Sequence, residues 1–150
     1  MQALNKWLED KLNYHFKDET LLKLSLTHRS ACQKNNERLE FLGDSALDLI
    51  VSEYLYSKYQ DDNEGILTSK RSLLVDETAL SKIAKELNLN DFIRMSEEEL
   101  KRGGNLRESA LADAMEALIG AIFLDRGYEY VREFTLNLLK NSCVFVSKLL

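Results

Sequence analysis

The chain has 150 residues, of which 45% are hydrophobic and 30% charged, and its formal net charge is −5. This length and apolar content predict one globular domain that is large enough to fold around its own core. No stretch approaches the roughly 18 uncharged apolar residues of a membrane span, and the first residues lack the apolar segment of a signal peptide. The two cysteines, Cys32 and Cys143, lie far apart without metal-ligand spacing. The sequence therefore indicates a cytoplasmic protein with reduced thiols and no membrane association.

Helical periodicity begins at the N-terminus, where residues 2–12 form an amphipathic pattern. Asp18 is the expected N-cap of a second helix, which runs as far as Leu26. A polar loop then continues to Asn36. His28 lies in this loop, and we interpret it as a hydrogen-bonded structural residue rather than a catalytic one.

The stretch 36–59 is a long helical pattern with four acids on one side. On a helical wheel, Glu37, Glu40, Asp44 and Asp48 fall within an arc of roughly 80°. Like charges three or four residues apart destabilise a helix by about 0.2–0.5 kcal/mol per pair, and the stripe holds no Lys or Arg. A bound metal ion is therefore the expected counter-charge. Apolar residues cover much of the remaining circumference, which predicts that most of this helix is buried.

Two of these acids have simpler explanations. Asn36 is the expected N-cap, which places Glu37 in the first helical turn, where negative charge is favourable. Asp48 lies where the acidic stripe gives way to apolar residues. We therefore expect Asp48 to be a salt-bridged surface acid.

The stretch 107–127 complements the first one. It is apolar around most of its circumference, and its only charges away from the two ends are Asp113 and Glu116. These acids share a narrow strip with the small residues Ser109 and Gly120. This pattern predicts a second buried helix with its acids on one face.

A glycine interrupts each of these helical patterns. Gly43 lies beside Asp44, and Gly120 lies in the strip of Asp113 and Glu116. A glycine inside a helix costs up to about 1 kcal/mol relative to alanine, so a close approach of backbone or ligand is the expected reason for each. We therefore expect the two helices to cross with their acidic strips facing. The acids that would converge are Glu40, Asp44, Asp113 and Glu116.

The remaining segments are expected to be short helices and turns. Residues 60–65 form a turn, and the helix that follows carries Thr68, Lys70 and Arg71. Residues 77–87 form another amphipathic helix. Ser96 and Glu99 fit a capping box. A flexible loop at 101–105 follows, and Gly127 is expected to separate the acidic helix from a last helix over 128–149.

Four motifs in this chain resemble bacterial ribonuclease III, the double-stranded-RNA endonuclease. They are LTHRS (26–30), NERLEFLGDSALD (36–48), EGILT (64–68) and ESALADAMEALIGAIFLD (108–125). Their order and spacing agree over most of the chain. The resemblance implies an all-α endonuclease domain of about seven to nine helices over residues 1–150. It also implies that the separate double-stranded-RNA-binding domain of the family is missing from this chain.

The resemblance implies hydrolysis of RNA phosphodiesters to 5′-phosphate and 3′-hydroxyl ends, in the processing of ribosomal or messenger RNA. An all-carboxylate site suits Mg²⁺, with Mn²⁺ as a substitute, rather than zinc. Its expected ligands are Glu40, Asp44, Asp113 and Glu116. Of these, Asp44 and Glu116 are expected to take part most directly in catalysis.

Further roles are implied with less support from the residues themselves. The side chains expected beside the metal or against RNA are Glu37, Glu64, Lys70 and Arg71. Phe41 is expected to contact the partner subunit, because one site cuts one strand and cleavage of both strands requires a symmetric homodimer.

Two other interpretations remain open. Glu37 and Glu40 form an ExxE pair, which is typical of all-α Mg²⁺-dependent nucleoside triphosphate pyrophosphatases. The acidic net charge is unusual for a nucleic-acid-binding protein, so a catalytically weak RNA-binding or scaffold domain of the same fold is the other alternative.

Overall fold

The structure, a computed structural model, describes residues 1–142 and 144–145. Within these residues it contains eight α-helices and two 3₁₀ turns, and an isolated bridge between Thr27 and Arg94 is the only β-pairing. The all-α prediction is therefore confirmed. The helices are α1 (Gln2–Leu12), α2 (Glu19–Ser25), α3 (Glu37–Lys58), α4 (Glu64–Val75), α5 (Glu77–Glu86), α6 (Glu97–Lys101), α7 (Glu108–Arg126) and α8 (Tyr128–Lys140), and the turns are η1 (Leu89–Asp91) and η2 (Gly104–Leu106).

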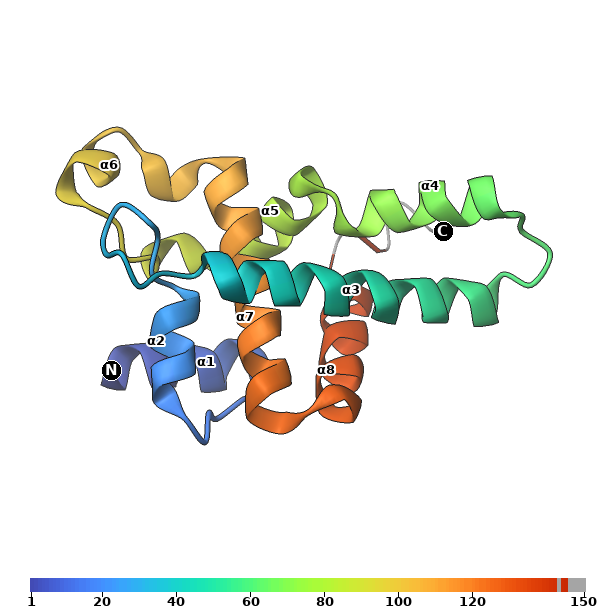
Figure 1. Cartoon of the computed structure of the whole chain (residues 1–150), viewed down its shortest axis with the longest axis horizontal. Helices are drawn as coiled ribbons and strands as arrows, with labels where there is room; N and C mark the ends of the chain where they lie inside the picture. The colour runs from blue at the N-terminus through green and yellow to red at the C-terminus, as the bar shows by residue number, and fades with distance from the viewer. Residues whose placement is uncertain (143, 146–150) are drawn as a thin grey trace.

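Helix α7 forms the centre of the molecule. Eleven of its residues are buried, and α2, α3, α5 and α8 all pack against it. Helix α3 crosses α7, and its C-terminal half continues outward beside α4 as an antiparallel hairpin (Figure 1). Both halves of α3 contribute buried residues, such as Leu39 and Leu47 in the first half and Ile50 and Leu55 in the second.

Helix capping explains most of the helix starts. Asp18 accepts a hydrogen bond from the Thr20 N–H, and Ser96 accepts one from the Glu99 N–H, as predicted for both. Asn36 occupies the predicted N-cap position of α3, but its side chain makes no capping hydrogen bond. The Asn36 side chain is buried and donates to the Ser25 carbonyl, while the Asn35 side chain accepts the Glu37 N–H.

The prediction that most of α3 is buried is wrong for one face. Phe41, Leu49 and Tyr56 are 77%, 57% and 75% exposed, respectively. These three residues lie within about 80° of one another around the helix, so they form one apolar stripe. We call them the α3 stripe. It is large enough to suggest an interface with another molecule.

The last helix is shorter than predicted. Helix α8 ends at Lys140, and a turn at Asn141 and Ser142 follows it. Residues 143 and 146–149 of the predicted range lie outside the described residues. No helix in the described chain has the length and apolar content that a membrane crossing requires.

Candidate metal centre

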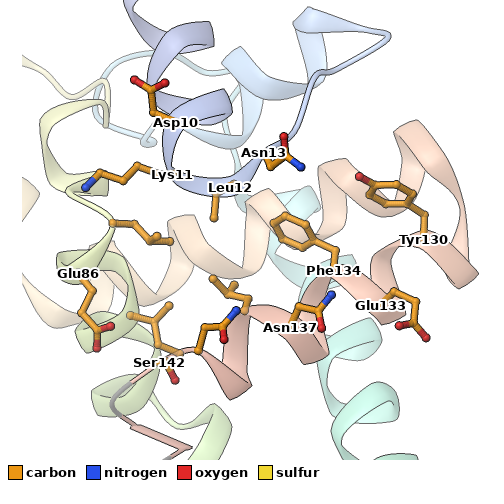
Figure 2. A pocket seen from close by; sticks show the side chains of 14 residues that line it. Asp10, Lys11, Leu12, Asn13, Glu86, Tyr130, Glu133, Phe134, Asn137 and Ser142 are labelled. Atoms are coloured by element: carbon orange, nitrogen blue, oxygen red, sulfur yellow. The ribbon is translucent and has the colours of Figure 1, made fainter.

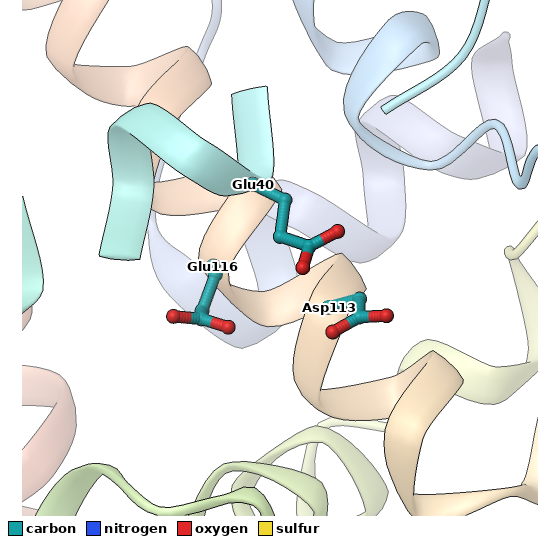
Figure 3. Close-up of side chains that lie close together, drawn as sticks. All are labelled: Glu40, Asp113 and Glu116. Carbon is teal, nitrogen blue, oxygen red and sulfur yellow. The ribbon is translucent and has the colours of Figure 1, made fainter. Parts of the chain in front are cut away.

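The crossing of α3 and α7 brings the predicted acids together. Glu40 on α3 and Asp113 and Glu116 on α7 each offer a carboxylate oxygen, and these three oxygens lie within 4.8 Å of one another. The three side chains point toward a common space between the helices (Figure 3). All three are partly buried.

Asp44 completes the group from the next turn of α3. Its carboxyl group lies within hydrogen-bonding reach of Glu116, and its side chain is the most exposed of the four. Helices α3 and α7 therefore supply two acids each, although Asp44 and Asp113 are 69 positions apart in the sequence.

The two predicted glycines make this crossing possible. A Cβ atom at Gly43 would lie 1.7 Å from the Glu116 carbonyl oxygen, and one at Gly120 would lie 2.4 Å from the Leu39 carbonyl oxygen. Neither position has space for a side chain, because backbone meets backbone there. The predicted close approach is confirmed, and backbone rather than a ligand occupies the space.

The acids resist ionisation in this arrangement. Burial raises the pKa of Glu116 to about 9, and both the hydrogen bond that its protonated form donates to Asp44 and the negative charge of Asp44 add to the effect. Burial and the neighbouring Asp113 raise the pKa of Glu40 to about 7. The pKa of Asp113 is also raised, mainly by burial. At neutral pH the cluster therefore holds protons unless a cation replaces them.

The donor set fits a hard divalent ion. Oxygen ligands alone are what Mg²⁺ and Mn²⁺ prefer, and no His or Cys joins this group among the described residues. The raised pKa values also indicate that the cluster lacks positive charge, because a bound ion would stabilise the ionised carboxylates and lower these pKa values.

Competition between protons and metal gives a measurable pH dependence. Because the folded-state pKa values lie above the usual value of 4.5, the metal-free folded chain binds more protons than the unfolded chain between about pH 5 and pH 9, and its stability falls as the pH rises. We expect the increase in melting temperature on adding Ca²⁺ to grow across this range. Differential scanning calorimetry with Ca²⁺ or EDTA at each pH measures it, and a pH-independent increase would contradict metal binding at these acids.

The other predicted site residues are spread more widely. Glu37 lies beside the cluster, where it lines a cavity with Glu40 and Asp113. Asp48 is half-buried, and no ion pair of it occurs among the described residues, so its expected salt bridge is absent there. Burial and Asp44 raise the pKa of Asp48, which extends the acidic stripe instead of ending it.

Glu64, Lys70 and Arg71 lie away from the cluster. Glu64 and Tyr56 line the same cavity between α3 and α4. At 1.5 Å per residue, Tyr56 lies about 24 Å from Glu40 along the axis of α3, so Glu64 is far from the cluster in the same chain. Lys70 pairs with Asp62 at 2.5 Å, and Arg71 donates to the Ser52 hydroxyl at 2.9 Å. Both cations therefore have intramolecular partners at the hairpin.

A larger cavity lies elsewhere and lacks such a cluster. It measures about 710 Å³ and opens between α1, α5 and α8 (Figure 2). Its carboxylates include Asp10 and Glu133, but no set of three metal-ligating side chains converges there among the described residues. The acidic cluster is thus a better candidate for the functional site than the larger cavity.

Sequence reasoning missed a basic wall beside the cluster. His28, Arg29 and Arg107 line the same cavity as Glu37 and Asp113. These three residues come from two loops far apart in sequence, so no helical periodicity links them to the acids. The sequence signal was that His28 and Arg29 lie inside the LTHRS motif and that Arg107 directly precedes the motif that begins at Glu108.

Comparison with known proteins agrees with this geometry. A profile of the ribonuclease-III-like family matches residues 18–142. Ribonuclease 3 from Campylobacter jejuni is 50% identical over 136 residues, which are 90% of this chain and 61% of that protein. Ribonuclease 3 from Campylobacter fetus is 47% identical over 142 residues, which are 94% of this chain and 63% of that protein. The chain thus spans about three fifths of the length of these relatives.

A solved structure extends the match to three dimensions. The nuclease domain of ribonuclease III from Campylobacter jejuni, described for structural flexibility in a region involved in dimer formation, superposes with a TM-score of 0.89 at 49% identity. The match covers 92% of this chain and 97% of that domain. Sequence profile, relatives and fold therefore agree that the chain belongs to the ribonuclease-III-like family.

Proposed function

We propose that this chain is a metal-dependent endoribonuclease domain that cleaves double-stranded RNA to 5′-phosphate and 3′-hydroxyl ends. The observation that carries the proposal is the convergence of Glu40, Asp44, Asp113 and Glu116 where α3 crosses α7. Family membership supports the reaction class. The proposed setting is the cytoplasm, in the processing of ribosomal and messenger RNA.

The four acids are the proposed ligands of Mg²⁺, for which Mn²⁺ can substitute. When bound, such an ion polarises a phosphoryl oxygen, activates water and stabilises the leaving oxygen. Glu40 and Asp113 hold the partly buried side of the site. Asp44 and Glu116 are the proposed catalytic pair, since Asp44 is the most exposed acid and contacts Glu116, whose pKa is raised furthest.

The positions of the acids also direct the substrate. The cluster is open to solvent at Asp44 and adjoins a cavity of about 410 Å³ along the first turns of α3 and α7. A phosphodiester can therefore approach the cluster from the solvent-exposed face at Asp44, while α3 and α7 exclude water from the opposite face. Selection of a duplex would rely on the A-form groove and on 2′-hydroxyl groups rather than on base identity.

A homodimer is proposed for cleavage of both strands. The α3 stripe is exposed in the single chain, and Glu64, expected near the cleavage site, lies about 20 Å or more along α3 from its own cluster. Burial of the stripe against a second copy would remove this apolar surface from water. The dimer-forming region described for the Campylobacter jejuni nuclease domain supports this arrangement.

A charge in the α3 stripe should therefore break the dimer. We expect Phe41→Asp to be monomeric at micromolar concentration, because a carboxylate would be buried without a partner. Sedimentation equilibrium measures the mass. Leu124→Asp is the matched control, since Leu124 is 53% exposed but lies near the end of α7 and outside the stripe. A wild-type protein that sediments only as a monomer would contradict the proposed dimer.

Incubation with a perfect RNA duplex tests the activity directly. We expect cleavage with Mg²⁺ or Mn²⁺, and none with EDTA. The labelled products should carry 5′-phosphate and 3′-hydroxyl ends. Nucleoside triphosphates are the comparison substrate, because pyrophosphate release from them without duplex cleavage would favour the pyrophosphatase alternative. Metal binding without either reaction would favour the scaffold alternative.

A further inference from the structure

The cavity beside the acidic cluster has two chemically different walls. It measures about 410 Å³, and its acidic wall consists of Glu37, Glu40 and Asp113, while a fourth lining acid, Glu99, pairs with Arg107. The other wall carries basic and hydrogen-bonding side chains. They are His28, Arg29 and Ser30 from the loop before α3, and Arg107, which directly precedes α7. Positive groups thus stand next to a site that is itself proposed to hold cations.

A hydrogen-bond network fixes the orientation of His28. Its Nδ1 atom accepts the Ser30 N–H at 3.1 Å and lies 2.8 Å from the Ser30 hydroxyl oxygen. The same hydroxyl oxygen accepts the Ser96 N–H at 3.1 Å, which leaves its own hydrogen for Nδ1. The backbone N–H of His28 donates to the Arg94 carbonyl. The segment before α6 therefore fixes the backbone of His28, and Ser30 fixes its ring.

This network determines which ring nitrogen can act on a ligand. Burial, together with the charge of Arg29, lowers the pKa of His28, so the ring is neutral near pH 7. Because Nδ1 accepts hydrogen bonds, the hydrogen of the neutral ring is on Nε2. Within the described residues this Nε2–H has no hydrogen-bond partner. It is a free donor on a residue that lines the cavity.

The two arginines differ in what they already bind. Arg107 forms an ion pair with Glu99. Gly104 packs directly against this pair, because a Cβ atom there would lie 2.8 Å from the Arg107 guanidinium. Arg29 is exposed and, within the described part of the chain, forms no ion pair. Arg29 is thus the cation of this wall without an ion-pair partner among the described residues, and its charge acts against the burial that raises the pKa of Asp113.

We propose that this cavity binds a backbone phosphate of the RNA strand, other than the phosphate at the acidic cluster, through the guanidinium of Arg29 and the Nε2–H of His28. The inference rests on the proposed function, and it assigns positioning residues rather than catalytic ones. A guanidinium and a neutral N–H donor both suit phosphate oxygens. Metal ions would bind the acidic wall next to them. Negative phosphates and positive groups would then alternate across the site.

Removal of the Arg29 charge tests the proposal. We expect Arg29→Gln to weaken binding of a short RNA duplex in Ca²⁺ about tenfold, and to reduce the slope of log affinity against log salt by about one. Fluorescence anisotropy over a series of salt concentrations measures both quantities. In Mg²⁺, KM should rise about tenfold while kcat changes less than about threefold, because the contact holds substrate and transition state alike.

Arg132→Gln is the matched control. It removes the same unit of charge from α8, where Arg132 pairs with Glu53 and Glu133, and α8 contributes no residue to the cavity. Affinity and salt slope should stay at the wild-type values in this variant. An equal loss in both variants would show only the effect of net charge and would overturn the assignment of Arg29.

Two substitutions of His28 separate recognition from support. His28→Gln places an amide donor near the position of Nε2, whereas His28→Asn keeps a polar group near Nδ1 and loses the Nε2 donor. We expect His28→Gln to keep most of the duplex affinity and His28→Asn to lose about fivefold or more. The opposite order would mean that His28 acts only through Ser30, and it would overturn its role in phosphate binding. Melting temperatures of both variants report the structural contribution separately.

Failure of this inference is distinguishable from failure of the proposed function. If the wild-type protein neither binds nor cuts a duplex, the endoribonuclease proposal itself is wrong. If the wild-type protein cuts the duplex, and Arg29→Gln retains the wild-type affinity, salt slope and KM, only the phosphate site is wrong.

Discussion

Replacement of Glu116 with glutamine should abolish cleavage of duplex RNA and, at the same time, raise the melting temperature of the metal-free protein. The loss of cleavage follows from the proposed role of this carboxylate. A thousandfold decrease in kcat corresponds to about 4 kcal/mol of transition-state stabilisation, which is within the range that a catalytic metal ion and its ligands supply.

The gain in stability follows from the electrostatics of the cluster. Glu116 is partly buried between Asp44, Glu40 and Asp113, and this environment raises its pKa to about 9. Above the ordinary pKa of a glutamate, the unfolded chain loses this proton and the folded chain keeps it, so folding becomes less favourable as the pH rises. Glutamine has nearly the same shape and no charge to lose. In EDTA at pH 8 the variant should therefore melt a few degrees higher, since about 1 kcal/mol shifts a domain of this size by about 4 °C.

Two measurements separate this interpretation from a structural one. Ca²⁺ should raise the melting temperature of the wild-type protein much more than that of Glu116→Gln. Glu129→Gln, at an exposed position on α8, should keep both the activity and the Ca²⁺ response of the wild type. A Glu116→Gln variant that is inactive and also less stable in EDTA would mean that the carboxylate supports the fold and that its loss of activity is indirect.

This opposition between stability and activity is what made the site predictable from sequence. A strip of like charges on an otherwise apolar helix has no folding advantage, and the same is true of a glycine in the middle of each helix. Glu40 and Asp44 beside Gly43, and Asp113 and Glu116 near Gly120, were unfavourable enough locally to indicate a shared purpose. The pairing of the two helices then followed from the strips alone.

The parts that sequence reasoning missed depend on relations between distant segments. A helical wheel for α3 shows that Leu49 is apolar, but it does not show whether the same chain covers it, so its burial was wrongly expected. Asn36 is the N-cap residue of α3, as predicted, but its side chain does not cap the helix, for a related reason. The side chain reaches back to Ser25 at the end of α2, and the Asn35 side chain accepts the Glu37 N–H instead.

Arg29 and Arg107 illustrate the same limit at the site. They are 78 residues apart in the sequence and lie on irregular segments that have no period to analyse. Glu64 shows the reverse case, because its motif suggested nearness to the acids while the chain places it beside Tyr56 at the α3–α4 hairpin. Short motifs identify residue types well, but they do not show where the fold places a residue relative to a site.

The second large effect is expected at Gly43, where a single methyl group should destabilise the whole domain. A Cβ atom there would lie 1.7 Å from the Glu116 carbonyl oxygen and 2.6 Å from its carbonyl carbon. Both are backbone atoms inside α7, so no side-chain rotation can relieve the overlap. We expect Gly43→Ala to cost about 4 kcal/mol or more, which is exceptional for so small a change. Urea denaturation of purified protein measures this loss, and failure to accumulate as folded protein would be its extreme form.

Gly65→Ala is the control for this prediction. Gly65 also lies in a helix, but a Cβ there would meet only the Asn63 side chain, at 3.5 Å. Alanine should therefore be neutral or stabilise the domain by up to about 1 kcal/mol, because it favours the helix over the unfolded chain. The contrast between two identical substitutions isolates the helix crossing from the general preference of helices for alanine.

Gly120→Ala connects this packing to the metal centre. Its Cβ would lie 2.4 Å from the Leu39 carbonyl oxygen, a smaller overlap than at Gly43, so a folded variant is more accessible to measurement. Relief of the overlap must push α3 away from α7, and this movement separates Glu40 and Asp44 from Asp113 and Glu116. We expect the folded Gly120→Ala protein to lose most of its Ca²⁺-dependent gain in melting temperature along with its cleavage activity. Wild-type Ca²⁺ response in a folded Gly120→Ala protein would show that the acids need no close crossing, and the proposed shared site would then be wrong.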